Sequence, residues 1–262
     1  MIEELLYGAA ALAAFKLMKK KPVAAADISD APPTSGETPG GSTYSPPDIS
    51  GGVAGAFAGA GNGGGGAIEK GARAAATPER IARIKAAWQG IEIPGLNHIA
   101  LALFIGQREA GSNYRPLNKI AAGRGYPLGM NQSGFVGMYQ VGAAGLEEAK
   151  FIKPRMSQKG NRTCLLDLSN WTDICPGGLE QFLNTPELQE LAFARFTNKN
   201  RRYIQSILTP GMPATDLGGY LAAAHLTGHG GAKALASGKV SKDANGASNA
   251  EYYRIGAASQ LA

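Results

Sequence analysis

The sequence has little that would suit a membrane-embedded or fibrous protein. Only 44% of the 262 residues are hydrophobic and the mean hydropathy is −0.13, which excludes a protein that crosses a bilayer several times. The 37 glycines follow no Gly-X-Y period, which excludes a collagen. Strand signals are also few. These absences leave a soluble, mainly helical domain with an irregular N-terminal arm.

Cysteine is scarce, and the two cysteines leave the redox state open. Cys164 and Cys175 would be small buried hydrophobic residues in a reducing compartment, whereas in an oxidising one they could close a loop worth roughly 3 kcal/mol. Their spacing does not suit a zinc site, and no histidine is near them in the sequence. We therefore expect neither a metal nor another cofactor.

The N-terminal arm is not expected to carry a cleavable export signal. Its positive charges follow the apolar run at positions 5–15, whereas in a secretory signal they come first. The run is also shorter than the roughly 20 residues of a spanning helix. Residues 1–21 are expected to form a short helix, either an assembly tag that packs on a partner or lies at a membrane surface, or a membrane anchor. Residues 22–76 are rich in Gly and Pro, which predicts a flexible linker.

Residues 77–262 are predicted to form one basic, mainly helical domain. They hold 20 basic and 13 acidic residues, a net charge of +7, and such a domain attracts DNA, RNA, anionic lipid and acidic cell-wall polymers alike. About 185 residues can bury a sizeable core. Helix starts are marked by Thr77 before Pro78, by Asn97, by Thr185 before Pro186, by Thr215 or Asp216, and by Ser248 with Glu251 in a capping box.

Glu109 is the first candidate for chemistry. It ends the apolar helix predicted from Asn97, just ahead of Gly111. A carboxyl group at a helix C-terminus faces the negative end of the helix dipole, and beside apolar walls it would hold its proton tightly enough to act as a general acid near neutral pH. The alternative is a surface glutamate paired with Arg108 or Arg115.

Two further segments have compositions typical of a ligand cleft. Positions 133–142 combine small residues, which let the backbone approach a ligand, with an aromatic ring and an amide. Positions 219–231 indicate a small-residue helix that runs into a glycine turn and carries His225 and His229. Glycines at 228, 230 and 231 disfavour a continuous helix through His229, so a metal site is not expected. The alternatives are a turn packed on the core and a satisfied buried histidine.

In order and separation, these segments resemble the soluble lytic transglycosylases of the goose-type lysozyme superfamily, especially the phage-associated branch. Members have a helix that ends in a catalytic Glu, then a Gly-x-x-Gln loop, then an Ala-Tyr-Asn-Ala-Gly-like element. Glu109 matches the catalytic acid, and the Gly-x-x-Gln loop is matched by Gly137, Met138, Tyr139 and Gln140. The resemblance covers positions 97–256. It departs from the pattern at Ala224 and His225, which replace Tyr and Asn, and at the insertion 155–178.

The resemblance implies a lysozyme-like helical domain and a mechanism with one carboxyl group. Inverting or retaining hydrolysis needs two carboxylates about 5 to 9.5 Å apart. The acids otherwise available lie in no segment of cleft-like composition: Asp167, Asp173, Glu147 and Glu148. In this family the substrate supplies the missing groups, because its N-acetyl oxygen shields the charge at C1 and its C6 hydroxyl attacks C1. Glu109 would protonate the glycosidic oxygen and then accept the proton of that hydroxyl.

The same resemblance implies the substrate contacts and the function. Gln140 is expected to hold an N-acetyl or hydroxyl group and Tyr139 to line the cleft, with His225 and Tyr220 or Tyr252 as further contacts. The expected function is a peptidoglycan lytic transglycosylase that cleaves the MurNAc-GlcNAc β-1,4 bond and leaves a 1,6-anhydro product. It would be carried in a virion and act in the bacterial periplasm, with the bacterial cell envelope as the alternative location.

Other partners and functions stay open. Besides peptidoglycan, other virion proteins or a membrane could bind residues 1–21, and nucleic acid is not expected as a partner. One alternative function is a hydrolytic muramidase of the same fold. The other is a non-catalytic virion or envelope structural protein that binds glycan or nucleic acid through its basic face.

Overall fold

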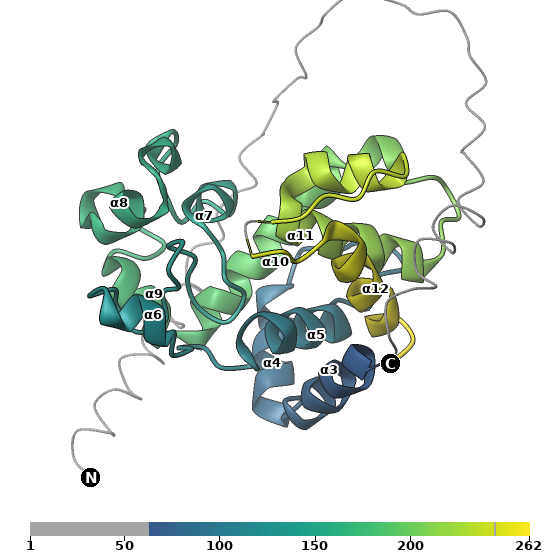
Figure 1. Ribbon diagram of the computed structural model, residues 1–262, viewed down its shortest axis with the longest axis horizontal. Coiled ribbons are helices and arrows are strands. Elements are labelled where there is room, and N and C mark those ends of the chain that lie inside the picture. Colours follow the sequence, from purple (N-terminus) through teal and green to yellow (C-terminus); the bar gives the residue numbers. More distant parts are fainter. Residues whose placement is uncertain (1–62, 244) are drawn as a thin grey trace, which may run out of the picture. The chain divides into compact units, whose positions relative to one another are not determined.

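The computed structural model describes residues 63–243 and 245–262, so the predictions for residues 1–21 and for residues 22–62 lie outside the described residues. The described part is built from helices and contains no strand, which confirms the mainly helical prediction (Figure 1). None of its helices is both long and apolar enough to cross a membrane. The α-helices are α3 (Gly63–Ala74), α4 (Pro78–Ala87), α5 (His98–Ala110), α6 (Lys119–Gly123), α7 (Ala143–Glu148), α8 (Asn161–Leu166), α9 (Gly178–Asn184), α10 (Pro186–Tyr203), α11 (Ala214–Ala236) and α12 (Asn249–Ser259). The 3-10 helices are η1 (Met156–Lys159), η2 (Leu168–Asn170) and η3 (Gln205–Ile207).

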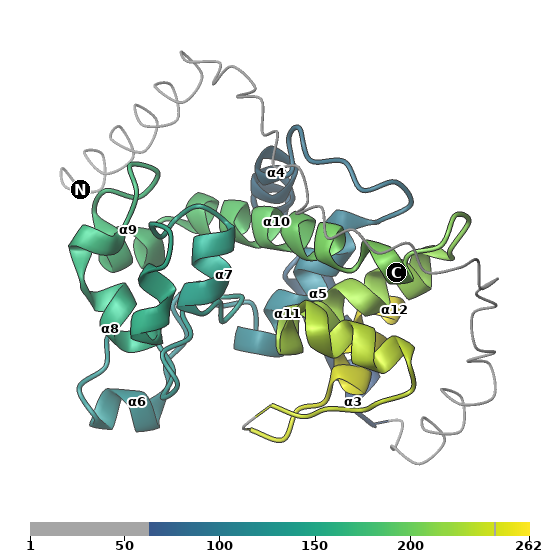
Figure 2. The same ribbon diagram turned by 90° about the horizontal axis from the view of Figure 1, so that it is seen from above.

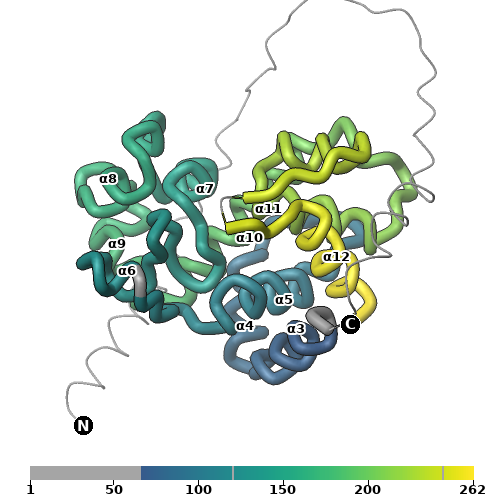
Figure 3. The backbone as a smooth tube through the Cα atoms, in the orientation of Figure 1, coloured from purple at the N-terminus to yellow at the C-terminus, as the bar shows by residue number. Residues whose placement is uncertain are grey.

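The helices form two groups, which Figures 1 and 2 show from two directions. In the first group α11 packs along α12, α3 packs along α5, and α12 contacts α5. In the second group α8 contacts both α7 and α9. Helix α10 contacts α4 and α11 of the first group and α7 and α9 of the second, so it joins them. Figure 3 traces the chain from the end of α5 into the second group at α6 and back through α10.

Several helices begin at the predicted cap residues. Thr77 Oγ1 accepts a hydrogen bond from the N–H of Arg80 (3.3 Å) at the start of α4. Asn97 Oδ1 accepts one from the N–H of Ala100 (3.1 Å) at the start of α5. Helix α5 ends at Gly111, whose φ of 58° is the left-handed conformation that glycine adopts without strain. The predicted bounds of α5, which carries Glu109, are therefore confirmed.

The predicted capping box at α12 forms only in part. Ser248 Oγ accepts a hydrogen bond from the N–H of Glu251 (3.1 Å), as a cap residue should. The Glu251 carboxylate does not complete the box and instead binds Arg108 on α5 (2.9 Å). The cap starts the helix, and the freed carboxylate ties α12 to α5.

Helix α11 differs from the prediction at both ends. It begins at Ala214, directly after Pro213, ahead of the predicted start at Thr215 or Asp216. The predicted interruption of the helix before His229 is found at Gly228, which has the non-helical angles φ 69° and ψ 175°, but the chain is helical again beyond it, up to Ala236. A single non-helical glycine was enough to redirect the helix without ending it.

Part of the predicted flexible linker, residues 22–76, is helical in the structure. Residues 63–74 form α3, in which Ala72 is buried and Ile68 partly buried against the core. A Cβ atom on Gly71 would lie 2.4 Å from the end of the Gln107 side chain of α5, so the two helices approach closely here and a larger residue would displace that side chain. Packing against α5 thus makes a helix of a Gly/Ala-rich sequence, and the folded domain starts before residue 77.

Cys164 and Cys175 are free and buried, so the structure holds two thiols and no bond between them. Cys175 Sγ donates a hydrogen bond to the carbonyl oxygen of Gly178 (3.2 Å), and burial raises the pKa of this thiol to about 12. We expect a maleimide at neutral pH to label neither cysteine in the native protein and both after unfolding in guanidinium. Rapid labelling of the native protein, or unfolded protein that labels only after reduction, would contradict this assignment.

Candidate active site

Helix α5 places Glu109 at the edge of the core. The helix is buried over most of its length, where Leu101, Phe104 and Ile105 are covered by neighbouring helices. Glu109 follows in its last turn, and its side chain is 14% exposed. The carboxyl group therefore lies where an apolar helix ends and solvent begins.

Glu109 lines a pocket of about 310 Å³, a volume at the lower end of the range for small-ligand sites. Amide side chains and apolar side chains form the other walls: Asn113, Asn118, Asn131 and Gln140, and Ala110, Pro116, Leu117 and Met130. Among the described residues, Glu109 is the only carboxylate in this lining. The pocket thus offers one titratable group among neutral hydrogen-bonding groups.

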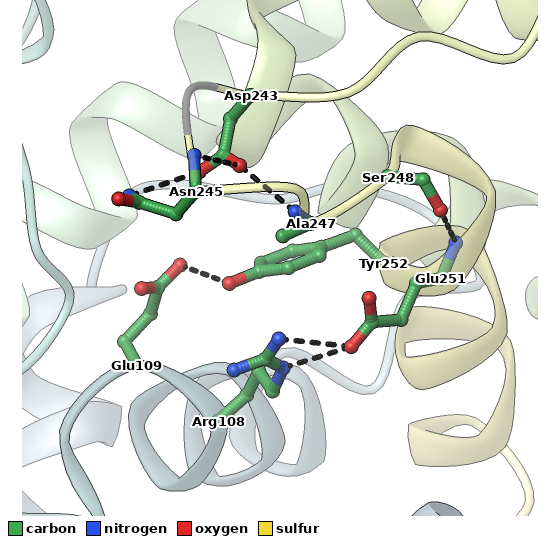
Figure 4. A network of polar contacts seen from close by, with 8 residues as sticks. All are labelled: Arg108, Glu109, Asp243, Asn245, Ala247, Ser248, Glu251 and Tyr252. Carbon is green, nitrogen blue, oxygen red and sulfur yellow. Dashed lines mark hydrogen bonds and ion pairs between the residues drawn. The ribbon is translucent and has the colours of Figure 1, made fainter.

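The two oxygens of Glu109 have different surroundings. Oε1 accepts a hydrogen bond from the hydroxyl group of Tyr252 (2.7 Å; Figure 4) and lies 3.5 Å from His225 Nε2. Oε2 accepts no hydrogen bond from any described residue. One oxygen therefore holds the side chain in place, and the other is left for a ligand in the pocket.

Neither neighbouring arginine pairs with Glu109. Arg108 directs Nε and Nη2 to Glu251 Oε1, at 3.1 and 2.9 Å (Figure 4). Arg115 binds Glu180, at 3.2 Å between Nη1 and Oε1, and Asn184. The alternative of a surface glutamate paired with Arg108 or Arg115 is therefore wrong.

Tyr252 is a buried partner of Glu109. It reaches the carboxylate from α12, is only 2% exposed, and has the Arg108 guanidinium 5.5 Å from its ring centre. Burial and the charge of Glu109 raise the pKa of Tyr252 well above its ordinary value. The phenol therefore stays protonated, and its O–H group donates the hydrogen bond to Glu109. This corrects the expected role of Tyr252, which does not line the pocket.

His225 connects Glu109 to the Gly137–Gln140 loop. Its Nε2 lies 2.9 Å from the carbonyl oxygen of Tyr139, and since a carbonyl oxygen only accepts, Nε2 is the nitrogen that carries the proton. The imidazole is 5% exposed and has the rings of Phe193 and Phe196 edge-on at 5.6 and 5.9 Å. This environment holds the imidazole between the loop backbone and Glu109 Oε1.

The two histidines of α11 have different surroundings. His229 lies beyond the kink, where its ring is 4.7 Å from the ring of Tyr203. In the described part of the chain no three His, Cys, Asp or Glu side chains gather as a metal site would require.

Helix α10 fixes the backbone of the Gly137–Gln140 loop. A Cβ atom on Gly137, whose φ is 71°, would lie 2.4 Å from Gln189 Oε1, so only glycine fits there. The same Gln189 oxygen accepts a hydrogen bond from the N–H of Met138 (2.8 Å). Gln140 also has a positive φ, 44°, which is uncommon for a residue with a side chain and concentrates at functional sites.

The four amides of the pocket present defined atoms to a ligand. Backbone N–H groups bind Oδ1 of each asparagine: Arg115 N to Asn113, Ala121 N to Asn118, and Ser133 N and Phe135 N to Asn131. Their NH₂ groups donate to no described residue, so these remain as donors. Gln140 is arranged the opposite way, because its Nε2 donates to Gly137 O (2.7 Å) and its Oε1 remains as an acceptor.

Three other predicted contact residues lie in the core. Met138 and Tyr139 are 0% and 1% exposed, and Tyr220 is 4% exposed with its ring edge-on to Tyr253 at 5.1 Å. The predictions that Tyr139 and Tyr220 line the cleft are therefore wrong, because both rings fill the interior. Of the loop's side chains, only that of Gln140 faces the pocket.

Glu190 was not among the predicted site residues, although it binds the hydroxyl group of Tyr139 in the Gly137–Gln140 loop. Its carboxylate is fully buried and accepts hydrogen bonds from the hydroxyl groups of Tyr114 (2.6 Å) and Tyr139 (2.5 Å), with Arg80 Nε at 3.7 Å. Burial raises the pKa of Glu190, and the two hydroxyls and Arg80 oppose that shift. Glu190 precedes buried Phe193 by three residues, which places both on the apolar face of α10. This spacing is the feature of the sequence that could have indicated a buried acid.

Comparison of the chain with protein-family models, with curated proteins and with solved structures finds no match. The function must therefore be argued from the chemistry of the site. That site is one carboxyl group with an anchored oxygen and an unpaired oxygen, in a pocket whose amides offer three donors and one acceptor.

Proposed function

We propose that the described domain is a lytic transglycosylase with a lysozyme-like helical fold. It cleaves the β-1,4 bond between MurNAc and GlcNAc in peptidoglycan and leaves a 1,6-anhydro product. The observation that carries the proposal is the lone carboxyl group of the pocket, with Glu109 Oε1 held by Tyr252 and Oε2 unpaired. This is the arrangement that a reaction with one proton-transferring group requires.

In the first step Glu109 acts as a general acid. Its Oε2 proton passes to the glycosidic oxygen, the bond between that oxygen and C1 of MurNAc breaks, and positive charge develops at C1. The substrate's own N-acetyl oxygen shields that charge. The Tyr252 hydroxyl stabilises the carboxylate that remains, because a hydrogen bond to a charged acceptor is stronger than one to a neutral acceptor.

In the second step Glu109 acts as a general base. The C6 hydroxyl of MurNAc attacks C1, its proton passes to Glu109, and the new C6–O–C1 bond closes the anhydro ring. No water is consumed and Glu109 regains its acid form. Hydrolysis with two carboxylates would need a second acid about 5 to 9.5 Å away, and the pocket lining supplies none.

The pocket amides suit the N-acetyl groups of this substrate. An acetamido group has one N–H donor and one carbonyl acceptor. Gln140 Oε1 can accept the N–H, and the NH₂ group of Asn118 or Asn131 can donate to the carbonyl oxygen or to a ring hydroxyl. Each is positioned by a hydrogen bond to the backbone, so little side-chain freedom is lost when the sugar binds.

Digestion of purified peptidoglycan sacculi tests the proposal. Mass spectrometry of the released fragments is expected to show 1,6-anhydromuropeptides. Fragments heavier by one water would instead show a hydrolytic muramidase. Sacculus binding without any soluble product at pH values from about 5 to 8 would show a non-catalytic glycan-binding protein.

Replacing Tyr252 by Phe is expected to lower kcat by about tenfold to hundredfold and to change KM little. The variant loses one hydrogen bond to the developing carboxylate, and bonds to charged groups contribute about 1.5–3 kcal/mol. Tyr253→Phe is the matched control, because that neighbouring hydroxyl donates to Asp216 instead. Equal activities of the two variants would show that Tyr252 does not assist Glu109.

We propose in addition that the enzyme is carried in a virion and acts on the periplasmic cell wall, with the bacterial cell envelope as the alternative. This rests on the resemblance to the phage-associated branch. Residues 1–21 would then bind another virion protein or a membrane. Detection of the chain in purified particles, and its absence from the envelope of uninfected cells, is the expected result, and the reverse distribution would contradict it.

A further inference from the structure

Basic residues greatly outnumber acidic ones in the chain segment that contains α6, α7 and the start of α8. Between positions 119 and 162 the chain has seven basic residues and only two acidic ones. Six of the seven are exposed and lie within 4 Å of no described carboxylate: Lys119, Arg124, Lys150, Lys153, Arg155 and Arg162. We call these six residues the basic surface. Only Lys159 has an acidic partner, Asp167 at 3.9 Å.

The two acids of this segment do not neutralise the basic surface. Glu147 accepts hydrogen bonds from the backbone N–H groups of Arg155 (2.9 Å) and Ser157 (3.0 Å), so it serves to close a turn. Glu148 Oε2 lies 3.7 Å from Lys199 Nζ on α10, and the carboxylate also accepts a hydrogen bond from the hydroxyl group of Tyr203. The segment therefore keeps a net positive charge, which attracts a polyanionic partner.

The basic surface begins at the edge of the pocket. Asn118 lines the pocket and caps α6, and Lys119 is the first residue of that helix. Arg124 follows α6 directly, and the guanidinium of Arg162 on α8 lies 4.4 Å over the ring of Tyr126. This contact ties the start of α8 to the segment that follows α6, and Figures 1 and 2 both show α6, α7 and α8 in one group.

Exposed apolar side chains beside the basic surface favour a peptide over a nucleic acid as its partner. Leu117, which lines the pocket, is 62% exposed, and Leu128 is 45% exposed, so exposed apolar side chains flank Lys119 and Arg124 in the sequence. A peptide that carries both carboxylates and methyl groups complements such a surface. A phosphate backbone complements only its charge.

We propose that the basic surface binds the carboxylates of the stem peptides attached to MurNAc residues of the glycan strand. The inference rests on the proposed function and adds the part of the substrate that the pocket does not contact. A strand held at Glu109 would carry its stem peptides over α6 toward α8, and their carboxylates would replace the missing acidic partners. The surface would thereby favour peptide-bearing wall over bare glycan.

The test measures binding of the full chain in a Glu109→Gln background, so that sacculi are not digested. The variant is Lys119→Gln/Arg124→Gln/Arg162→Gln. The matched control is Lys233→Gln/Lys239→Gln/Lys242→Gln, which removes the same charge from exposed positions on α11 and the segment after it. The probes are sacculi free of teichoic acid, the soluble glycan strands that an amidase releases from the same sacculi, and duplex DNA. In the released strands each MurNAc has lost its stem peptide and carries one lactyl carboxylate in its place. Circular dichroism confirms that both variants are folded.

The expected result is about tenfold weaker binding of the variant to intact sacculi, with a smaller dependence on salt and less than about twofold change in the control. On the released glycan strands, which lack the carboxylates of the stem peptides, the variant should lose clearly less binding than on intact sacculi. An equal loss in the control, or an equal loss on the released glycan strands, would overturn the proposal. The proposal would also be overturned if the variant bound DNA more weakly but bound sacculi as tightly as its parent. That result would identify a nucleic-acid surface.

Failure of this inference and failure of the proposed function are distinguishable. If the protein with Glu109 intact releases no fragments from sacculi, the proposed function is wrong. If it releases fragments while the triple variant still binds intact sacculi as tightly as its parent, only the stem-peptide surface is wrong.

Discussion

Replacing Glu109 by Gln is expected to lower the release of soluble muropeptides by roughly 10²–10⁴-fold, the usual contribution of a general acid and base. The amide can neither give a proton to the glycosidic oxygen nor take one from the C6 hydroxyl. It retains a carbonyl oxygen that can accept the Tyr252 hydrogen bond, so the fold should be preserved. Release rates from sacculi, with the thermal midpoint measured in parallel, check both expectations.

Glu92→Gln is the matched control for this prediction, because Glu92 is exposed and is not part of the pocket lining. It removes the same charge and should leave the rate within about twofold. Glu109→Asp is a second test, since it retains the carboxyl group but shortens its reach and should also lose most of the activity. Undiminished release by Glu109→Gln would remove Glu109 from the mechanism.

Replacing Glu190 by Leu is expected to reduce the free energy of unfolding by about 3–5 kcal/mol, because the change leaves the Arg80 charge buried without its acidic partner. Arg80 is 4% exposed, so water cannot take over the role of the carboxylate. The hydroxyl groups of Tyr114 and Tyr139 also lose their acceptor. Urea unfolding followed by circular dichroism measures the loss.

Two variants make this prediction specific. Glu187→Leu changes an exposed glutamate of the same helix and should alter stability by less than about 0.5 kcal/mol. The double variant Arg80→Met/Glu190→Leu removes both charges and should recover much of the lost stability. Additive losses in the double variant would show that the two side chains do not depend on each other.

The parts of the fold that could be predicted from the sequence rest on local chemistry. Thr77, Asn97 and Ser248 cap their helices because a cap residue acts on N–H groups within three positions of itself. The end of α5 was predictable for the same reason, since Gly111 can adopt a positive φ. The Gly-x-x-Gln pattern also led to Gln140, which the fold brings to the pocket of Glu109.

The partners of Glu109 could not be predicted in the same way. Tyr252 is 143 residues away in sequence, and its approach depends on how α12 packs against α5. The direction of Tyr139 depends on positive φ angles at Gly137 and Gln140, which turn the tyrosine into the core. Glu190 was missed because a glutamate is normally expected at the surface, although its spacing on α10 indicated burial.

Digestion of sacculi in water labelled with oxygen-18 tests the one-carboxyl mechanism most directly. Attack by the C6 hydroxyl consumes no water, and the anhydro ring leaves no free hydroxyl at C1 that could exchange with solvent. The mechanism therefore predicts released muropeptides whose mass is the same in labelled and unlabelled water. Fragments that carry one labelled oxygen at C1 of MurNAc would contradict it, because they would show that water was the nucleophile.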